Sequence, residues 1–507
     1  MPRIHSLSSL SLLALAPCIS LSLPMNPAHA QAPQYSLTIY SSAQPGQLSP
    51  EALQNYGQAL PGYALVRDRR ALSLPDGTGE VRFTDVATRI DPTTVSFASL
   101  TDPAGTRVIE QNYQFDLVDG QKLLQRYIGE TVTVDQVQGD KFERISGKLL
   151  SASNGLILMK DSGEVVTLNQ YTNIQFPSLP GGLITKPTLV WLVNAKRGGT
   201  HDAVVSYQTQ GLTWWSDYNV TLGSNAEDCR MDLAAWVTIV NQSGGSFPAT
   251  QLKLVAGEVN RAPAAPMAAA PMMKTMAVAE TQAQDGFQES SLFEYHLYTL
   301  GRRTDLPNNS TKQLELFPAA IGTQCKRELV FTAGPGPWRW YGTPVTDQGF
   351  GATQPGKVGA YLEFKNDQAN GLGIPLPAGR VRVNQASKAD GSLEFIGEDL
   401  IKHTPRNENL RIKLGESFDV VGDRKQTDFK VDVDAKWIEE SFEISVRNRK
   451  QEATTVVARE YLYRWSGWTI KSASRDYVKR DAETIDFPLT IPADGEAKFN
   501  YTVRYTW

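Results

Sequence analysis

Short runs of alternating apolar and polar residues recur along almost the whole chain, separated by clusters of turn-forming residues. The clearest run closes the chain, where aromatic and aliphatic side chains alternate with polar ones from Ala497 to Trp507. Such alternation is typical of a strand that buries one side and exposes the other to water. Because turn clusters keep the runs short, the sequence predicts a mainly β protein.

Five short runs of this kind crowd into residues 121–180. This density of short strands is typical of a small β-barrel of the SH3 or Sm kind. Two of the runs are joined by a turn in which Gly163 can take the positive φ that a tight hairpin needs. We therefore expect a small barrel at 121–180, preceded by an N-terminal β region at 31–120.

Longer strands follow the barrel, and we expect a β-sandwich at 181–350 and a C-terminal Ig-like β-sandwich at 351–507. The first sandwich is interrupted by RAPAAPMAAAPMMKTMAVAETQAQDG at 261–286, which holds four of the eight methionines and no aromatic residue. Such a segment cannot pack a core, so we expect a flexible loop within the sandwich. A Met-rich amphipathic helix is the alternative, but three prolines interrupt its first half.

The first 30 residues have the pattern of a secretory signal peptide. Arg3 is their only formal charge, a serine-rich apolar stretch follows, and Ala28 and Ala30 form an A-x-A site that predicts cleavage before Gln31. An uncleaved membrane anchor is the alternative. We expect an exported protein, periplasmic or extracellular, with no transmembrane helix in the mature chain.

Net charge and cysteine content indicate which partners and which cross-links to expect. The formal net charge of −4 is too small and of the wrong sign to favour nucleic acid as a partner. Beyond the signal peptide the chain has two cysteines, Cys229 and Cys325, and an exported chain with a small even number of cysteines usually pairs them. We expect a disulfide between them.

The usual catalytic and cofactor motifs are missing: the sequence contains no H-E-x-x-H, C-x-x-C, G-x-S-x-G, Walker or G-x-G-x-x-G pattern. We expect no metal and no cofactor. The triplet Asp161-Ser162-Gly163 matches the D-[ST]-G of aspartic proteases, but a hairpin tip favours the same residues for turn geometry alone.

The best acid/base cluster consists of Glu398, Asp399 and His403 in GEDLIKHTPRNE. Two carboxylates beside an imidazole could transfer protons or bind a divalent ion. The stretch falls between two predicted strands, where polar residues are usually solvated, so a structural role is favoured.

Tryptophans supply the other candidate site. Exposed aromatic platforms can bind glycans or peptides, and Trp338, Trp340 and Tyr341 form a candidate aromatic binding surface. Trp214 and Trp215 are adjacent, so in a strand they point to opposite faces and at most one can belong to such a platform. Core packing is the favoured interpretation of both pairs.

Several stretches together resemble one exported bacterial family, which carries domain of unknown function 4139 and is of the mucoidy-inhibitor-like kind. They are PSLPGGLITKPTLVW (177–191), VVSYQTQGLTWWSDYNVTL (204–222), LKLVAGEVNR (252–261), LYTLGRRTDLPNNSTKQLELF (297–317), and PLPAGRVRVNQ with IGEDLIKHTP (375–405). The resemblance covers roughly residues 123–507. It implies a β architecture, export and a link to the cell envelope, and it carries over no catalytic residues.

These observations favour a non-enzymatic exported β-protein that binds or organises an envelope component, either a glycan or a protein. The alternative is a hydrolase that acts on envelope polysaccharide or peptide through Glu398, Asp399 and His403. The sequence does not indicate the oligomeric state.

Overall fold

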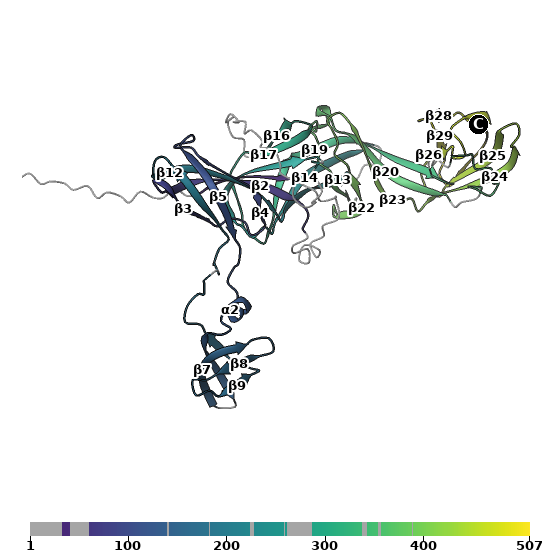
Figure 1. Cartoon of the computed structure of the whole chain (residues 1–507). Helices are drawn as coiled ribbons and strands as arrows, with labels where there is room; N and C mark the ends of the chain where they lie inside the picture. Colours follow the sequence, from purple (N-terminus) through teal and green to yellow (C-terminus); the bar gives the residue numbers. More distant parts are fainter. Residues whose placement is uncertain are drawn as a thin grey trace, which may run out of the picture.

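A computed structural model of the chain describes residues 33–40, 60–138, 141–181, 183–223, 228–257, 259–260, 286–336, 342–352, 356–387 and 389–507. Strands dominate this part, which contains one α-helix, α2 (Gly120–Arg126), and one short 3-10 helix, η2 (Gln368–Asn370). The predicted mainly β fold is confirmed. Figure 1 shows an elongated body of sheets from which a small β domain stands off to one side. Among the described residues, no helix is long and apolar enough to cross a membrane.

The first sandwich occupies the N-terminal end of the body. Its larger sheet has the order β16-β17-β15-β1-β2-β12-β4, with β18 beside β15, and its smaller sheet has the order β3-β11-β5. Trp191 joins the two layers, because its ring lies 5.4 Å from those of Phe83 in the smaller sheet and Phe97 in the larger one. The larger sheet consists of β1 (Gln34–Tyr40), β2 (Tyr63–Leu74), β4 (Ile90–Ser99), β12 (Gly199–Gln210), β15 (Phe247–Ala256), β16 (Phe287–Leu292), β17 (Tyr295–Leu300) and β18 (Thr304–Leu306). The smaller sheet consists of β3 (Gly77–Thr84), β5 (Thr106–Gln114) and β11 (Thr188–Ala195).

This pairing corrects the predicted division between residues 31–120 and 181–350. Strand β2 pairs along its whole length with β12, and β11 pairs with β3 on one side and β5 on the other. The two ranges therefore form one unit of packing. Periodicity identifies the strands, but it carries no information on which distant strand covers each apolar face.

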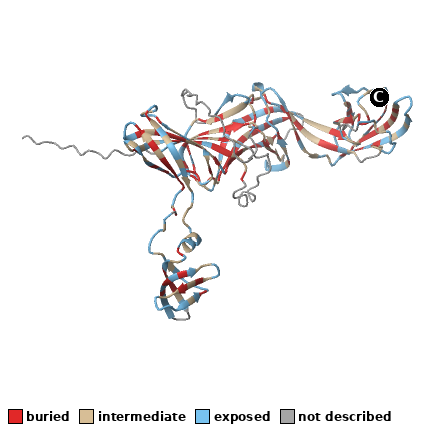
Figure 2. Cartoon of the chain, viewed as in Figure 1, coloured by how far each residue is buried: buried red, intermediate tan, exposed pale blue. Residues whose placement is uncertain are grey.

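The small β domain is inserted between β5 and β11. Its five strands have the order β10-β6-β7-β8-β9 and enclose a separate core, which appears as the lower red cluster in Figure 2. The strands are β6 (Thr131–Gln138), β7 (Lys141–Ser151), β8 (Leu156–Met159), β9 (Val165–Leu168) and β10 (Asn173–Gln175). Leu117 and Ile184 form a bridge between the two connecting segments, so the domain enters and leaves the body side by side.

A ten-stranded sheet forms the spine of the body. Its order is β22-β21-β13-β14-β19-β26-β29-β28, with β20 between β19 and β23. The 23-residue strand β19 carries Leu316 in the core of the first sandwich and Phe331 in the C-terminal core. Its members are β13 (Leu212–Leu222), β14 (Arg230–Asn241), β19 (Ser310–Thr332), β20 (Lys357–Lys365), β21 (Gly379–Ala386), β22 (Leu393–Ile401), β23 (Asn409–Glu416), β26 (Thr454–Tyr461), β28 (Val478–Lys479) and β29 (Thr484–Ile491).

The C-terminal sandwich packs a four-stranded sheet, β24-β25-β30-β27, against the β26-β29 end of the spine. Phe487 of β29 and Phe499 of β30 lie 4.5 Å apart across the layers. The added strands are β24 (Val420–Asp432), β25 (Trp437–Asn448), β27 (Trp468–Ala473) and β30 (Glu496–Thr506). The alternation predicted for β30 is confirmed by its burial pattern. The boundary at 351 needs correction, since β20, β21 and β22 extend the central sheet.

The predicted loop at 261–286 lies outside the described residues except for Gly286. The strands on either side of it pair as expected: β15 and β17 are antiparallel neighbours, with Leu254 opposite Tyr298. The strands that flank residues 261–286 in the sequence therefore belong to one sheet, not to two separate domains. The predicted signal peptide at 1–30 also lies outside the described residues.

Candidate functional site

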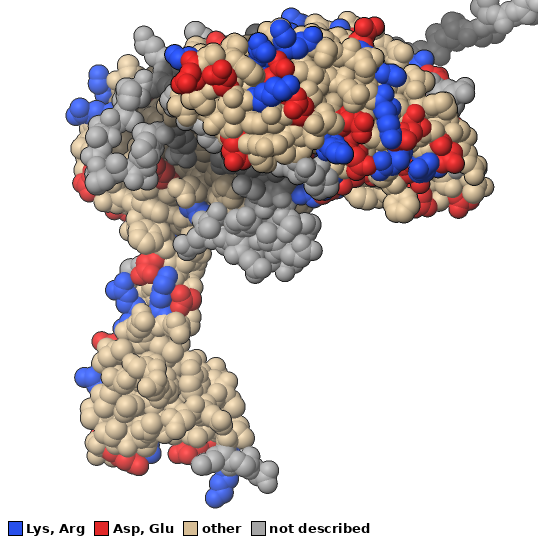
Figure 3. All heavy atoms as spheres, turned by 90° about the vertical axis from the view of Figure 1, so that its right-hand side faces the viewer, with Lys and Arg blue, Asp and Glu red and all other residues tan. Residues whose placement is uncertain are grey.

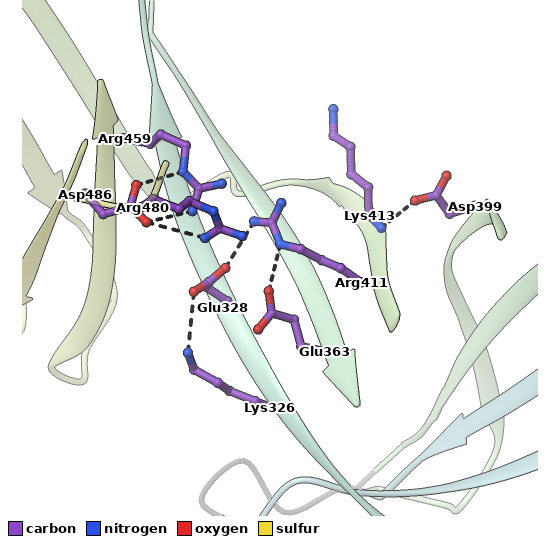
Figure 4. A network of polar contacts seen from close by, with 9 residues as sticks. All are labelled: Lys326, Glu328, Glu363, Asp399, Arg411, Lys413, Arg459, Arg480 and Asp486. Carbon is purple, nitrogen blue, oxygen red and sulfur yellow. Dashed lines mark hydrogen bonds and ion pairs between the residues drawn. The ribbon is translucent and has the colours of Figure 1, made fainter. Parts of the chain in front are cut away.

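Asp399 lies inside strand β22, which continues beyond the predicted strand end to Ile401. Its Oδ2 atom accepts the backbone N–H of Lys413 in β23 at 2.7 Å (Figure 4). The two strands approach closely here, because a side chain at Gly397 would clash with the carbonyl oxygen of Leu414. Asp399 therefore bonds β22 to β23 through its side chain and has a structural role.

Glu398 and His403 contact other parts of the protein than Asp399 does. Neighbouring side chains in a strand point to opposite faces, so Glu398 and Asp399 cannot converge on one substrate. The Oε2 atom of Glu398 lies 3.7 Å from Arg382 and 3.8 Å from Arg380. His403 is exposed, and its Nδ1 atom accepts the backbone N–H of Ala378 at 3.1 Å. The three candidate acid/base residues are not brought together, and no group of at least three His, Cys, Asp or Glu residues in the described part could hold a metal ion.

Trp214 and Trp215 point to opposite sides of β13, as the alternation rule requires. Trp214 is buried, and its indole N–H donates to the carbonyl oxygen of Ile39 at 3.2 Å. Trp215 lies on the outer face of the sheet and donates to the Oδ2 atom of Asp217 at 2.8 Å. Trp236 of β14 stands opposite Asp217 in the register and is 38% exposed.

Polar side chains continue this outer face across five strands. Asp217 also accepts a hydrogen bond from Thr238 at 3.1 Å and pairs with Arg382 at 3.3 Å. Gln313 of β19 donates to Thr238 at 3.2 Å. We call this surface the tryptophan face; it consists of Trp215, Asp217, Trp236, Gln313, Arg382 and Glu398. Of these residues, the sequence singled out Trp215 and Glu398.

A second polar cluster lies where the spine enters the C-terminal sandwich (Figure 4). Arg459 makes two 2.8 Å hydrogen bonds to Asp486, and these raise the pKa of Arg459. Arg480 approaches the same carboxylate at 3.4 Å. A depression of about 330 Å³ adjoins them. It is lined by Arg459, Tyr461, Arg480, Asp481, Ala482, Glu483 and Thr484. Since both signs of charge line it, the depression suits no simple anion or cation.

Arg411 connects the strands beside this depression. It pairs with Glu328 of β19 at 3.0 Å and with Glu363 of β20 at 2.8 Å, and its guanidinium lies 3.5 Å from the ring centre of Tyr361. Figure 3, viewed from the C-terminal end of the body, shows charges of both signs interspersed over the surface. These cations are matched by carboxylates, so the cluster links strands and does not form a basic patch.

Two ion pairs lie in the interior of the C-terminal sandwich. Arg424 with Glu460 and Arg464 with Glu440 each have a 2.8 Å contact, and all four side chains are at most 1% exposed. Arg464 also donates to three backbone carbonyls of the segment 342–352, and Arg424 donates to a fourth. The pairs fix this segment on the sandwich. Sequence reasoning missed them because charged residues in an alternating strand are expected to face water.

A buried Ser–His pair was also missed. The Nδ1 atom of His201 lies 2.9 Å from Oγ of Ser99, and its Nε2 atom lies 2.9 Å from the carbonyl oxygen of Arg197. Since a carbonyl only accepts, Nε2 carries a proton and donates to it. Both side chains are 2% exposed, so substrate cannot reach them, and the pair holds the end of β4 against β12.

Among the remaining sequence candidates, the structure describes the Asp-Ser-Gly triplet and the two cysteines. Asp161, Ser162 and Gly163 form an exposed hairpin turn in which Gly163 has a φ of 85°. Cys229 and Cys325 are joined by the expected disulfide, with alpha carbons 5.1 Å apart. Three aromatic residues proposed as a binding surface lie outside the described residues: Trp338, Trp340 and Tyr341.

No protein-family model matches the chain, and no curated protein matches it. The resemblance to the family with domain of unknown function 4139 therefore stays a prediction drawn from the residues. The site must be interpreted from its own geometry.

Proposed function

We propose that the protein is an exported, non-enzymatic β-protein that binds or organises a component of the cell envelope. The observation that carries the proposal is the position of Glu398 and Asp399 on opposite faces of β22, each engaged with neighbouring protein groups. A hydrolase needs its acid and base to reach the same bond. These two carboxylates do not meet that condition.

The shape of the molecule supports a binding role. The small β domain stands away from the body on two adjacent segments (Figure 1). The tryptophan face combines part-exposed aromatic rings with fixed polar groups, a composition that is typical of binding surfaces.

The proposal is tested by incubating the mature chain from Gln31 with sedimented envelope fractions. We expect the protein to sediment with the envelope while the supernatant gains no new reducing ends or free amino groups. A variant with Asp399→Asn and His403→Gln, neither of which lies on the tryptophan face, should sediment to the same extent. Failure of the wild-type chain to bind, or release of soluble product by the wild type but not by the variant, would overturn the proposal.

A further inference from the structure

The two tryptophans of the tryptophan face are close neighbours. Trp215 stands opposite Thr238 and Trp236 stands opposite Asp217, so the indoles occupy diagonal positions on one side of paired strands. Diagonal positions of this kind are about 7 to 8 Å apart. Two indoles at this spacing offer adjoining apolar surfaces, on which the C–H side of a sugar ring can stack.

The polar groups around the indoles are held in place before any ligand arrives. Asp217 orients the indole of Trp215, and Asp217 itself is fixed by Thr238 and Arg382. A surface that is already ordered loses little conformational entropy on binding. The side chains of Arg382 and Glu398 remain part-exposed, at 39% and 45%, and each offers two atoms in one plane, which suits pairs of adjacent hydroxyl groups.

The charges of the surface nearly balance, with one carboxylate in excess, because exposed Glu315 of β19 stands opposite Trp236 in the register. Arg380 and Arg382 lie beside the carboxylates of Asp217 and Glu398. A phosphate or uronate chain would gain nothing from such a surface, whereas a neutral ligand meets hydrogen-bonding groups without net repulsion. This balance favours an uncharged polyol over an anionic polymer.

The surface extends across β22, β21, β13, β14 and β19. With about 4.8 Å between neighbouring strands, five strands span about 19 Å, which accommodates an extended chain of several sugar rings. We propose that the tryptophan face binds a neutral envelope polysaccharide, an inference that rests on the proposed function and gives its ligand class.

The test measures binding of hexasaccharides to the mature chain by titration calorimetry and tryptophan fluorescence. Neutral hexamers of glucose and of N-acetylglucosamine are compared with a hexamer of an anionic uronic acid. We expect at least one neutral hexamer to bind and the uronate to bind more weakly. Trp236→Ala should weaken binding of the neutral hexamer about tenfold or more, since central aromatic residues dominate such interfaces. Trp236→Phe, which keeps a stacking ring, should retain most of the affinity.

Trp437→Ala supplies a matched control, because Trp437 is a part-exposed tryptophan of the C-terminal sandwich. It should leave binding unchanged. If no neutral hexamer binds, or if Trp236→Ala binds as tightly as the wild type at an equal melting temperature, the inference is overturned. If Trp236→Ala instead abolishes binding of an envelope protein, the inference is also overturned, because exposed Phe395 and Leu400 on β22, the last strand of this face, would then define a protein interface. Envelope sedimentation of the wild-type chain, measured in parallel, separates this failure from failure of the proposed function.

Discussion

The side chain of Asp399 accepts a backbone hydrogen bond from β23 where β22 approaches it. Substituting it with Ala removes the acceptor for Lys413 N–H, which lies 2.7 Å away. We expect Asp399→Ala to lower the free energy of unfolding by about 1 kcal/mol and Asp399→Asn, which keeps an acceptor oxygen, to lower it by less. Urea unfolding checks both values.

His403→Gln is the control for this prediction. His403 is exposed, and glutamine keeps a side-chain acceptor for the N–H of Ala378, so the replacement should change the free energy of unfolding by less than about 0.5 kcal/mol. Equal destabilisation by the two substitutions, or none from Asp399→Ala, would show that the bond between β22 and β23 is not what fixes Asp399.

The buried pair of Arg464 and Glu440 predicts a larger effect. Glu440→Gln leaves the guanidinium of Arg464 without its counter-charge in the interior, which typically costs about 3 to 5 kcal/mol. The double variant Glu440→Gln, Arg464→Met removes both charges and should be more stable than Glu440→Gln alone. Chemical denaturation of the wild type, both single variants and the double variant gives the comparison, and strictly additive losses would contradict a coupled pair.

At the residue scale, the sequence was sufficient where a prediction depended only on neighbouring positions in one strand. Alternation alone predicted that no more than one of Trp214 and Trp215 could face solvent. It could not show that Trp236, some twenty positions further along the chain, lies beside Asp217, because that proximity depends on strand register. The burial of Arg424 and Arg464 could not be predicted for a similar reason, since their carboxylate partners lie on other strands.

At the scale of elements, the disulfide fastens two strands that already pair. Cys229 precedes β14 and Cys325 lies in β19, 96 positions later, and the N–H of Cys325 donates to the carbonyl of Cys229 at 3.0 Å. Removing the cross-link frees a long loop in the unfolded chain, for which chain entropy gives about 4 to 5 kcal/mol as an upper figure.

We expect the double variant Cys229→Ser, Cys325→Ser to have a lower melting temperature than the wild type. Its far-ultraviolet circular dichroism spectrum at about 20 °C, which is below the unfolding transition of most domains, should stay unchanged. Titration of the denatured, oxidised wild type should find no free thiol. Two free thiols per chain, or an unchanged melting temperature in the double variant, would contradict this account.

The elements themselves were largely predictable, and their partners were not. All five strands of the inserted domain follow from short runs between turns, as does the terminal strand β30. The pairing of β2 with β12, more than 100 residues apart, and the single strand β19 shared by two cores are products of tertiary packing. The local sequence pattern determines the periodicity and length of each strand, whereas burial against distant residues determines which strands become neighbours.

At the scale of the whole molecule, buried tyrosines make stability depend on alkaline pH. Burial raises the pKa of Tyr35, with a smaller contribution from Asp68, and burial raises that of Tyr113, each from 10.0 to about 12. The unfolded chain loses these protons at a lower pH than the folded chain does. The stability that the protonated tyrosines contribute is therefore complete below about pH 10 and is lost as the pH rises toward about 12.

We therefore expect the urea midpoint to hold up to about pH 10 and then to fall steadily up to about pH 12. The variant Tyr35→Phe, Tyr113→Phe should show a shallower fall over the same window, because it has two fewer ionising groups. A midpoint that is constant up to pH 12, or an identical slope in the variant, would contradict the assignment.

We propose that this β-protein is exported and that it binds envelope material without cleaving it. The most direct measurement follows bound protein and released soluble product in the same incubation of the mature chain with isolated envelope, for the wild type and for His403→Gln. The account predicts equal binding by both proteins and no product from either. Product released by the wild type and lost in His403→Gln, at an unchanged melting temperature, would contradict it.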